Sequence, residues 1–211
     1  MSDPETRMKP RPLYMAALLL LCWAGVASAA PAGTVVGLSG ASTLESGGAR
    51  GAVRLGQPVE VGDTVEVPAD GKLKLRMADG SVISVAAGTR LTIAAYTVDA
   101  AGQRQDAQLS LARGLLRAVV APVERPAKFE VDTAVGAAAV RSTDWFVEGS
   151  ATAMQVGVLT GSVEMTSAAT KRPEMIPARW GARMEAGRDP VPPRLWSPAE
   201  FAAVIARTDV K

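Results

Sequence analysis

The stretch AAAVRSTDWFVE at residues 137–148 puts a cation, two hydroxyls and a carboxylate between two apolar runs. These polar side chains can form a turn between strands and hydrogen-bond the local backbone amides. They can instead form a contact surface, because arginine and aromatic residues are enriched in protein interfaces. Both interpretations stay open, and the second makes partner-binding candidates of Arg141, Thr143, Asp144 and Trp145.

The two aromatic residues of this stretch, Trp145 and Phe146, are neighbours in the chain. Successive side chains of a strand point to opposite faces, so only one of the two rings can enter the main core. Something else must cover the other ring, either the C-terminal segment of the chain or a partner. A ring left exposed beside Arg141 would favour a contact surface.

Three basic residues form a second candidate surface. Lys72, Lys74 and Arg76 alternate with apolar residues in the segment KLKLRM, which is the period of two of a half-buried strand. A solvated face, or charges that protect an exposed sheet edge from strand addition, explains such a stripe. An anionic glycan or an acidic partner is the alternative, and it makes these three residues further partner-binding candidates.

The sequence contains no histidine, and its single cysteine is Cys22. Catalysis by Ser-His-Asp or Cys-His groups therefore lacks its base, and zinc or copper sites built on these residues lack their ligands. A carboxylate pair acting on glycosides and a Ser-Lys dyad are the enzymatic routes that survive. The aspartates stand singly at turns, where they usually bond the local backbone. We predict a non-enzymatic protein with no cofactor.

Two further ligand classes are disfavoured. The loop VDAAGQRQDA has two aspartates but lacks the dense alternation of oxygen ligands that a calcium loop requires, so we expect no metal site. The chain has 23 basic and 21 acidic residues, a net charge of +2. Nucleic acid as a main partner calls for a larger basic excess.

The N-terminal segment resembles a secretory signal. Basic residues at positions 7, 9 and 11 precede an uncharged apolar run that ends in Ala27-Ser28-Ala29, the small residues that a signal peptidase requires. We expect residues 1–29 to be a signal peptide and the rest of the chain to be periplasmic. Leu21 before Cys22 disfavours lipidation. The alternative is an uncleaved anchor, because the apolar run is close to the minimum length that spans a bilayer.

Strand signals fill residues 34–186, where short alternating runs are separated by turns rich in glycine and aspartate. We therefore predict an all-β domain over residues 30–186. Residues 187–211 differ in kind. The proline-rich connector RDPVPPRLW should not join a sheet, and SPAEFAAVIAR should form a helix that begins at Ser197 and carries a capping box with Glu200. The apolar face of this helix is expected to dock on the β-domain, with docking to a partner as the alternative.

The order of the motifs resembles the FecR domain family. The family's turns match Gly62-Asp63 and Asp79-Gly80-Ser81, and they are followed by SLARGLLRAVV, FEVDTAVGAAAVRSTDWFVE and VLTGSVEM. The resemblance covers residues 34–168, with Ser142 where the family usually has glycine. It implies a compact all-β domain outside the cytoplasm, either a short β-solenoid or sandwich-like. It also implies a place among inner-membrane regulators that receive a signal from an outer-membrane transporter and control a sigma factor.

The resemblance, the N-terminal segment and the carboxylates together leave three hypotheses for function. Only 11 residues precede the apolar run, too few for a folded cytoplasmic arm, so we expect the outer module alone. The first hypothesis is a non-enzymatic periplasmic module, for envelope signalling or organisation, that binds an envelope protein or a cell-wall polymer. The second is a signalling subunit tethered to the membrane by its uncleaved N-terminus. The third and weakest is a carboxylate-dependent glycan-processing enzyme.

The intact mass of the exported protein separates the first two hypotheses. Cleavage after Ala29 would remove 29 of the 211 residues and leave 182. We expect mass spectrometry of the periplasmic fraction to show this shorter chain. The mass of the full chain, recovered with the inner membrane, would contradict cleavage and favour the tether.

Overall fold

A computed structural model of the chain describes residues 30–125 and 127–210. The expected signal peptide at residues 1–29 lies outside this part. Within the described residues the chain forms seventeen strands and one C-terminal helix, so the prediction of an all-β domain with a short helix is confirmed. The 11-residue helix is too short to cross a membrane, and the described residues contain no other helix that could.

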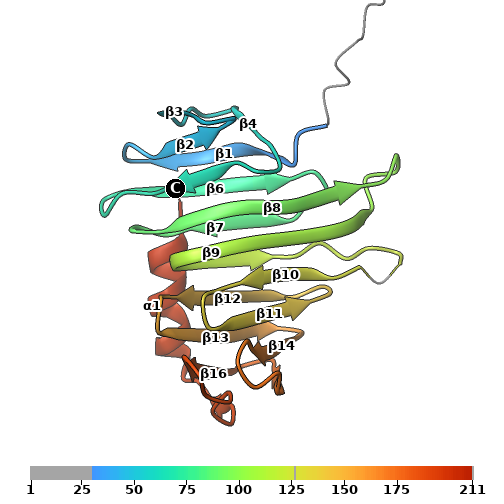
Figure 1. Ribbon diagram of the computed structural model, residues 1–211, viewed down its shortest axis with the longest axis vertical. Coiled ribbons are helices and arrows are strands. Elements are labelled where there is room, and N and C mark those ends of the chain that lie inside the picture. The colour runs from blue at the N-terminus through green and yellow to red at the C-terminus, as the bar shows by residue number, and fades with distance from the viewer. Residues whose placement is uncertain (1–29, 126, 211) are drawn as a thin grey trace, which may run out of the picture.

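The strands form two face-to-face layers because buried and accessible side chains alternate along them. In KLKLRM, Leu73, Leu75 and Met77 are buried while the three basic residues between them point outward. The chain lays short hairpins alternately on the two layers, which gives a sandwich-like stack of strands (Figure 1). Hydrogen bonds within each layer are antiparallel, except that β10 runs parallel to β9.

The first layer, which we call the helix-covered layer, follows the order β4-β1-β6-β7-β9-β12-β13-β16-β17. Its strands are β4 (Pro58–Val59), β1 (Gly33–Ser39), β6 (Lys72–Met77), β7 (Val82–Val85), the second half of β9 (Arg104–Val119), β12 (Asp144–Gly149), β13 (Ala153–Thr160), β16 (Trp180–Glu185) and β17 (Arg194–Leu195).

The second layer, which we call the open layer, follows the order β3-β2-β5-β8-β9-β10-β11-β14-β15. Its strands are β3 (Ala49–Ala52), β2 (Thr43–Ser46), β5 (Thr64–Glu66), β8 (Arg90–Val98), the first half of β9, β10 (Phe129–Asp132), β11 (Gly136–Val140), β14 (Ser162–Ser167) and β15 (Pro173–Pro177).

Strand β9 belongs to both layers and ties them together. Its first half pairs with β8 and β10, and its second half pairs with β7 and β12. The strand bends between the halves at Gly114, which has a φ of 101°. A Cβ atom there would lie 2.5 Å from the Cα of Thr89, so only glycine fits the bend. One continuous apolar core fills the space between the layers.

The helix α1 (Pro198–Thr208) lies across the outer face of the helix-covered layer and runs across the strands rather than along them (Figure 1). A second, smaller apolar cluster joins it to the sheet. Val204 of α1 packs there with Leu115 and Phe146, and Phe201 and Trp196 complete the cluster. The ring centroids of Phe146 and Trp196 are 5.2 Å apart. The helix therefore docks on its own β-domain, as the sequence predicted.

Local signals fix the start of α1. The Ser197 hydroxyl accepts a hydrogen bond from the Glu200 amide, and the Glu200 carboxylate accepts one from the Ser197 amide at 2.8 Å, so the predicted capping box is present. One expectation for the preceding connector is wrong. Arg194 and Leu195 do join the sheet, as strand β17 against β16, because the prolines of the connector lie before these residues and leave their amides free to pair.

A buried ion pair joins segments that are distant in sequence. The Arg104 guanidinium and the Asp79 carboxylate are both fully buried and contact each other directly. Asp79 also accepts hydrogen bonds from the Tyr96 hydroxyl at 2.7 Å and from the Ser81 hydroxyl at 2.8 Å. Burial and the adjacent Asp79 carboxylate raise the pKa of the Tyr96 phenol, which therefore stays a donor. On its other side, Arg104 donates to the backbone carbonyl of Arg141 at 2.8 Å.

We predict that Arg104→Met destabilises the fold strongly, by about 3–5 kcal/mol, because it leaves the Asp79 carboxylate buried without its counter-charge. The double variant Arg104→Met, Asp79→Asn removes both charges and should be more stable than the single variant. Urea unfolding followed by circular dichroism measures both free energies. A loss below about 1 kcal/mol for the single variant would contradict a central role of this pair.

The capping carboxylate predicts a pH dependence. The side-chain hydrogen bond from Arg194, together with the bonds from Ser197, lowers the pKa of Glu200 from 4.5 to about 2. A lowered pKa in the folded state contributes stability above the unfolded value, and that stability is lost as the pH falls toward the folded value. The difference in unfolding free energy between wild type and Glu200→Gln should therefore shrink between pH 4.5 and pH 2. A constant difference across this window would contradict the assignment.

Candidate functional site

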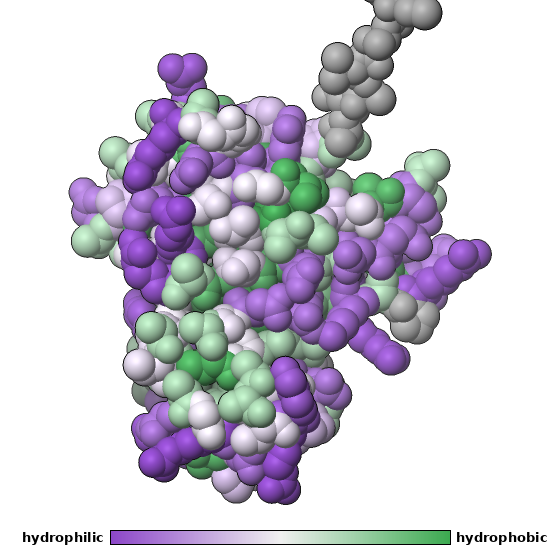
Figure 2. Space-filling view, viewed as in Figure 1, coloured by the Kyte–Doolittle hydropathy of each residue, from purple (hydrophilic) through white to green (hydrophobic). Residues whose placement is uncertain are grey.

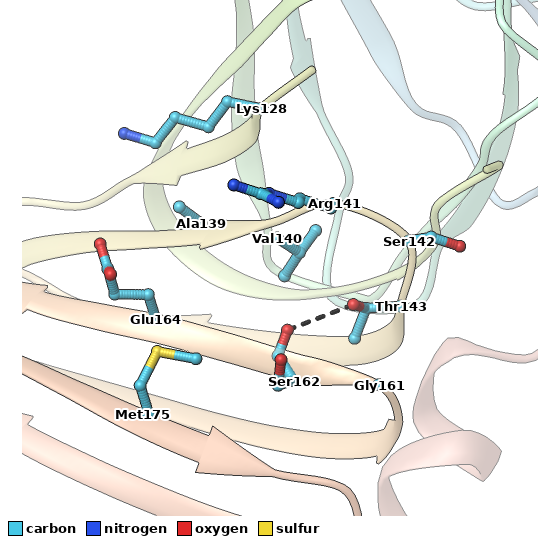
Figure 3. Close-up of a pocket in the computed structure, with 10 residues that line it drawn as sticks. All are labelled: Lys128, Ala139, Val140, Arg141, Ser142, Thr143, Gly161, Ser162, Glu164 and Met175. Carbon is cyan, nitrogen blue, oxygen red and sulfur yellow. Dashed lines mark hydrogen bonds between the residues drawn. The ribbon is translucent and has the colours of Figure 1, made fainter. Parts of the chain in front are cut away.

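A depression with a volume of about 560 Å³ lies at the end of β11 (Figure 3). We call it the loop groove. It is formed by residue 128 before β10, the end of β11, the loop at 141–143, the turn before β14, and β14 and β15. The lining residues are Lys128, Ala139, Val140, Arg141, Ser142, Thr143, Gly161, Ser162, Glu164 and Met175.

Hydrogen bonds fix the backbone of the 141–143 loop from both sides. The buried Arg104 donates to the Arg141 carbonyl at 2.8 Å, and the Val120 amide donates to the Thr143 carbonyl at 3.0 Å. The Thr143 hydroxyl, itself buried, donates to the Ser162 carbonyl at 3.2 Å, as Figure 3 shows. The loop is therefore a polar turn in its backbone, and its shape depends on the core.

Ser142 tolerates this turn although related domains usually have glycine there. Among the described non-glycine residues, only Lys171 and Arg179 have positive φ, so Ser142 adopts a conformation open to any residue. The close approach occurs on the neighbouring strand instead. A Cβ at Gly161, which has a φ of 83°, would lie 2.8 Å from the Thr143 hydroxyl oxygen. The glycine that this site needs is therefore Gly161.

The side chain of Arg141 extends into the loop groove from this fixed backbone. It is exposed and makes no hydrogen bond or ion pair with another described residue. Figure 3 shows its guanidinium on the same side as the Lys128 ammonium, which pairs with Glu130. The hydrogen bond to Glu130 raises the pKa of Lys128, so this ammonium keeps its charge. Met175 is 53% exposed across the groove.

Asp144, another predicted contact residue, faces the helix-covered side and is already paired. Arg117 donates to its carboxylate from two nitrogens, at 2.9 and 2.7 Å. This hydrogen bonding raises the pKa of Arg117, against the opposing effect of its partial burial. Asp144 therefore acts as one half of a bidentate cross-strand pair and does not line the loop groove.

The expectation of an outward aromatic ring is wrong for Trp145. Its side chain is 0% exposed and belongs to the main core between the layers. Phe146 points to the opposite face, as the alternation of the strand requires, but α1 covers it. Neither ring is available to a partner, because the main core encloses Trp145 and the C-terminal helix covers Phe146.

The basic stripe on β6 is also largely engaged. The Lys72 ammonium donates to the carbonyls of Ala206 and Asp209, at 2.8 and 2.9 Å, and the Lys74 ammonium donates to Val210 at 2.9 Å. These cations satisfy carbonyls at the C-terminal end of α1, where positive charge is favourable. The prediction that Lys72 and Lys74 are free to bind a partner is therefore wrong. Arg76 remains exposed.

Two of the described carboxylates, Glu66 and Glu200, are held in the charged form by arginines. No group of three or more acidic, histidine or cysteine side chains is positioned to hold a metal ion within residues 30–125 and 127–210. Hydrogen bonds from arginines lower the pKa of Glu66 and of Glu200. A general acid in glycoside hydrolysis needs a raised pKa instead.

Sequence reasoning found Arg141 and Thr143 but missed Lys128, Glu164 and Met175, which line the same groove. Lys128 lies just before β10, Glu164 lies on β14 and Met175 lies on β15. No local pattern distinguishes these residues from other outward-facing positions. The pairing of β11 with β14, and of β14 with β15, brings them beside the loop. A correct strand order would have been needed to find them.

Comparisons with known proteins agree with this fold. Residues 63–164 match the model of the FecR protein family. No protein with a curated description matches the sequence significantly. Two crystal structures of a "putative anti-sigma factor" from Parabacteroides distasonis ATCC 8503, at 1.65 and 2.50 Å resolution, each match with a TM-score of 0.55 and 17% identity. The matches cover 66% of this chain and 63% and 62% of those chains.

At this level of identity the two crystal structures show a shared fold, and the family match identifies the domain. That match begins at the turn containing Asp63 and ends at Glu164 in β14, so it includes the Asp79 turn and the 141–143 loop. Residues 63–164 of this chain therefore form a FecR domain.

Proposed function

We propose that this chain is a non-enzymatic interaction module of envelope signalling, that it works in the periplasm, and that it binds an envelope protein through the loop groove. The FecR match and the fold shared with a protein described as a "putative anti-sigma factor" support a signalling role. A cell-wall polymer is the alternative ligand. The N-terminal tether of the second hypothesis falls on residues outside the described part of the chain.

The observation that carries the proposal is the fixed presentation of Arg141. Its carbonyl is held by the buried Arg104, while its side chain is exposed in the groove. A backbone already held in one conformation loses little entropy on binding. Arginine and methionine are both enriched in interfaces, and Met175 lies across the groove from Arg141. The groove therefore combines a charged anchor with an apolar contact on a rigid support.

The position of α1 supports the choice of this groove over the other candidate surfaces. The helix covers Phe146, and Lys72 and Lys74 bond to carbonyls at its end, so these three residues are not available to a partner. The open layer has no such cover. Figure 2 shows the face turned toward the viewer, where residues of intermediate hydropathy are mixed with hydrophilic ones and strongly hydrophobic residues form only small separate areas.

Photocrosslinking in cells tests the proposal. A photoreactive amino acid at position 175 should capture one discrete protein partner, and the same group at Val191 should not. Val191 is a matched control for Met175, because the two side chains are 49% and 53% exposed and Val191 lies outside the groove. Adding Arg141→Glu to the Met175 variant should abolish capture without changing the thermal midpoint.

The pattern of adducts separates the alternatives. A heterogeneous adduct that a muramidase degrades would favour a cell-wall polymer over a protein. Equal capture from positions 175 and 191, or capture unaffected by Arg141→Glu, would contradict the loop groove as the binding surface.

A further inference from the structure

Three arginines from three strands converge on one carboxylate at the strand ends far from the loop groove. Glu66 of β5 accepts from Arg50 of β3 at 2.7 Å and from Arg113 of β9 at 2.6 Å. Arg90 of β8 lies 3.4 Å from the same carboxylate and 3.5 Å from Glu45 of β2. Three permanent positive charges thus face two negative ones.

The excess positive charge is directed to solvent. The side chains of Arg50 and Arg113 are 57% and 54% exposed, whereas Glu66 is only 26% exposed beneath them. A guanidinium has five N–H donors, and Glu66 uses only some of those on each arginine. The remaining donors of Arg50 and Arg113 can therefore accept a second carboxylate, and an added negative charge would relieve the repulsion between the like charges.

The cluster borders a groove that is longer than one anion. A depression of about 280 Å³ is lined by Thr43, Arg50, Glu66 and Arg113. A second depression, of about 520 Å³, shares Gly88 and Arg113 with the first. The two therefore adjoin at Arg113. We call the combined depression the arginine groove, and it crosses the end of the sandwich where β9 bends.

The lining of the arginine groove selects among ligand classes. In the second depression Glu148 pairs with Arg207 and Glu185 pairs with Arg183, so this part of the groove offers little excess positive charge to a polyanion. The described residues that line both depressions include no aromatic side chain on which a sugar ring could stack. A polypeptide that carries negative charge at one point only, and is otherwise uncharged, fits this distribution best.

We propose that the arginine groove binds an extended segment of a partner polypeptide, with an acidic side chain of that segment bound between Arg50 and Arg113. This site is separate from the loop groove, because β12 begins beside one groove at Asp144 and ends at the other at Gly149. It therefore goes beyond the proposed function, and either site can exist without the other.

Fluorescence anisotropy with the purified chain tests this inference. The probe is a fluorescein-labelled peptide in which two glutamates are flanked by glycine and serine, and the same peptide with two glutamines is the control ligand. We expect saturable binding of the acidic peptide only, and weaker binding at higher salt. Arg113→Gln should weaken binding about fivefold, because one exposed charge pair is lost.

Two variants make the test specific. Glu66→Gln should tighten binding of the acidic peptide, because the arginines lose their resident counter-charge. If the cluster only stabilised the sheet, this variant would lower the thermal midpoint without any gain in affinity. Arg141→Ala, which alters the loop groove, should leave peptide binding unchanged.

Three outcomes would overturn the inference. One is the absence of saturable binding of the acidic peptide to either the wild type or Glu66→Gln. Another is equal affinity for the acidic and glutamine peptides. The third is a loss of binding in Arg141→Ala, which would place the peptide in the loop groove and leave the proposed function intact.

Discussion

The buried pair of Arg104 and Asp79 is the constraint on which the rest of the structure depends. Removing two charges from water is unfavourable unless they pair and their remaining polar atoms are hydrogen-bonded. Asp79 meets this condition through Tyr96 and Ser81, and the two terminal nitrogens of Arg104 meet it by donating to the carbonyls of Arg141 and Ala121, whereas its buried Nε has no hydrogen-bond partner. The pair therefore fixes the turn between β6 and β7, the start of β9 and the 141–143 loop relative to one another. A surface loop takes its shape from an interaction in the core.

Features that depend on neighbours in sequence could be predicted. The alternation of Leu73 and Leu75 with lysines identifies a strand whatever lies beside it, and Ser197 with Glu200 defines a helix start within four residues. The same local logic places Trp145 and Phe146 on opposite faces of β12. The order of turn motifs was sufficient to identify the domain, because each turn is encoded by its own glycine and aspartate residues.

Features that depend on distant segments could not be predicted. Whether Lys72 faces solvent is decided by carbonyls at the end of α1 and just after it, which are more than 130 residues away in the chain. Arg104 resembles any other polar residue at the start of a strand, and nothing near it indicates that Asp79, 25 residues earlier, will bury beside it. The connector residues Arg194 and Leu195 joined the sheet because β16 offered a free edge, which the local proline content does not reveal. In each case the sequence specifies the group but not its partner.

The two grooves lie at opposite ends of the same strands, and this arrangement favours a bridging role over an allosteric one. β12 spans the distance between them with six residues, which corresponds to about 20 Å at the usual rise of a strand. Its side chains are packed on one face by the main core and on the other by α1, so a shift of the strand would disturb both packed faces. Coupling between distant sites requires an element with two discrete states, and close packing on both faces disfavours a second state of β12. The sandwich is therefore suited to hold two ligands at a fixed separation rather than to transmit a change of shape between them.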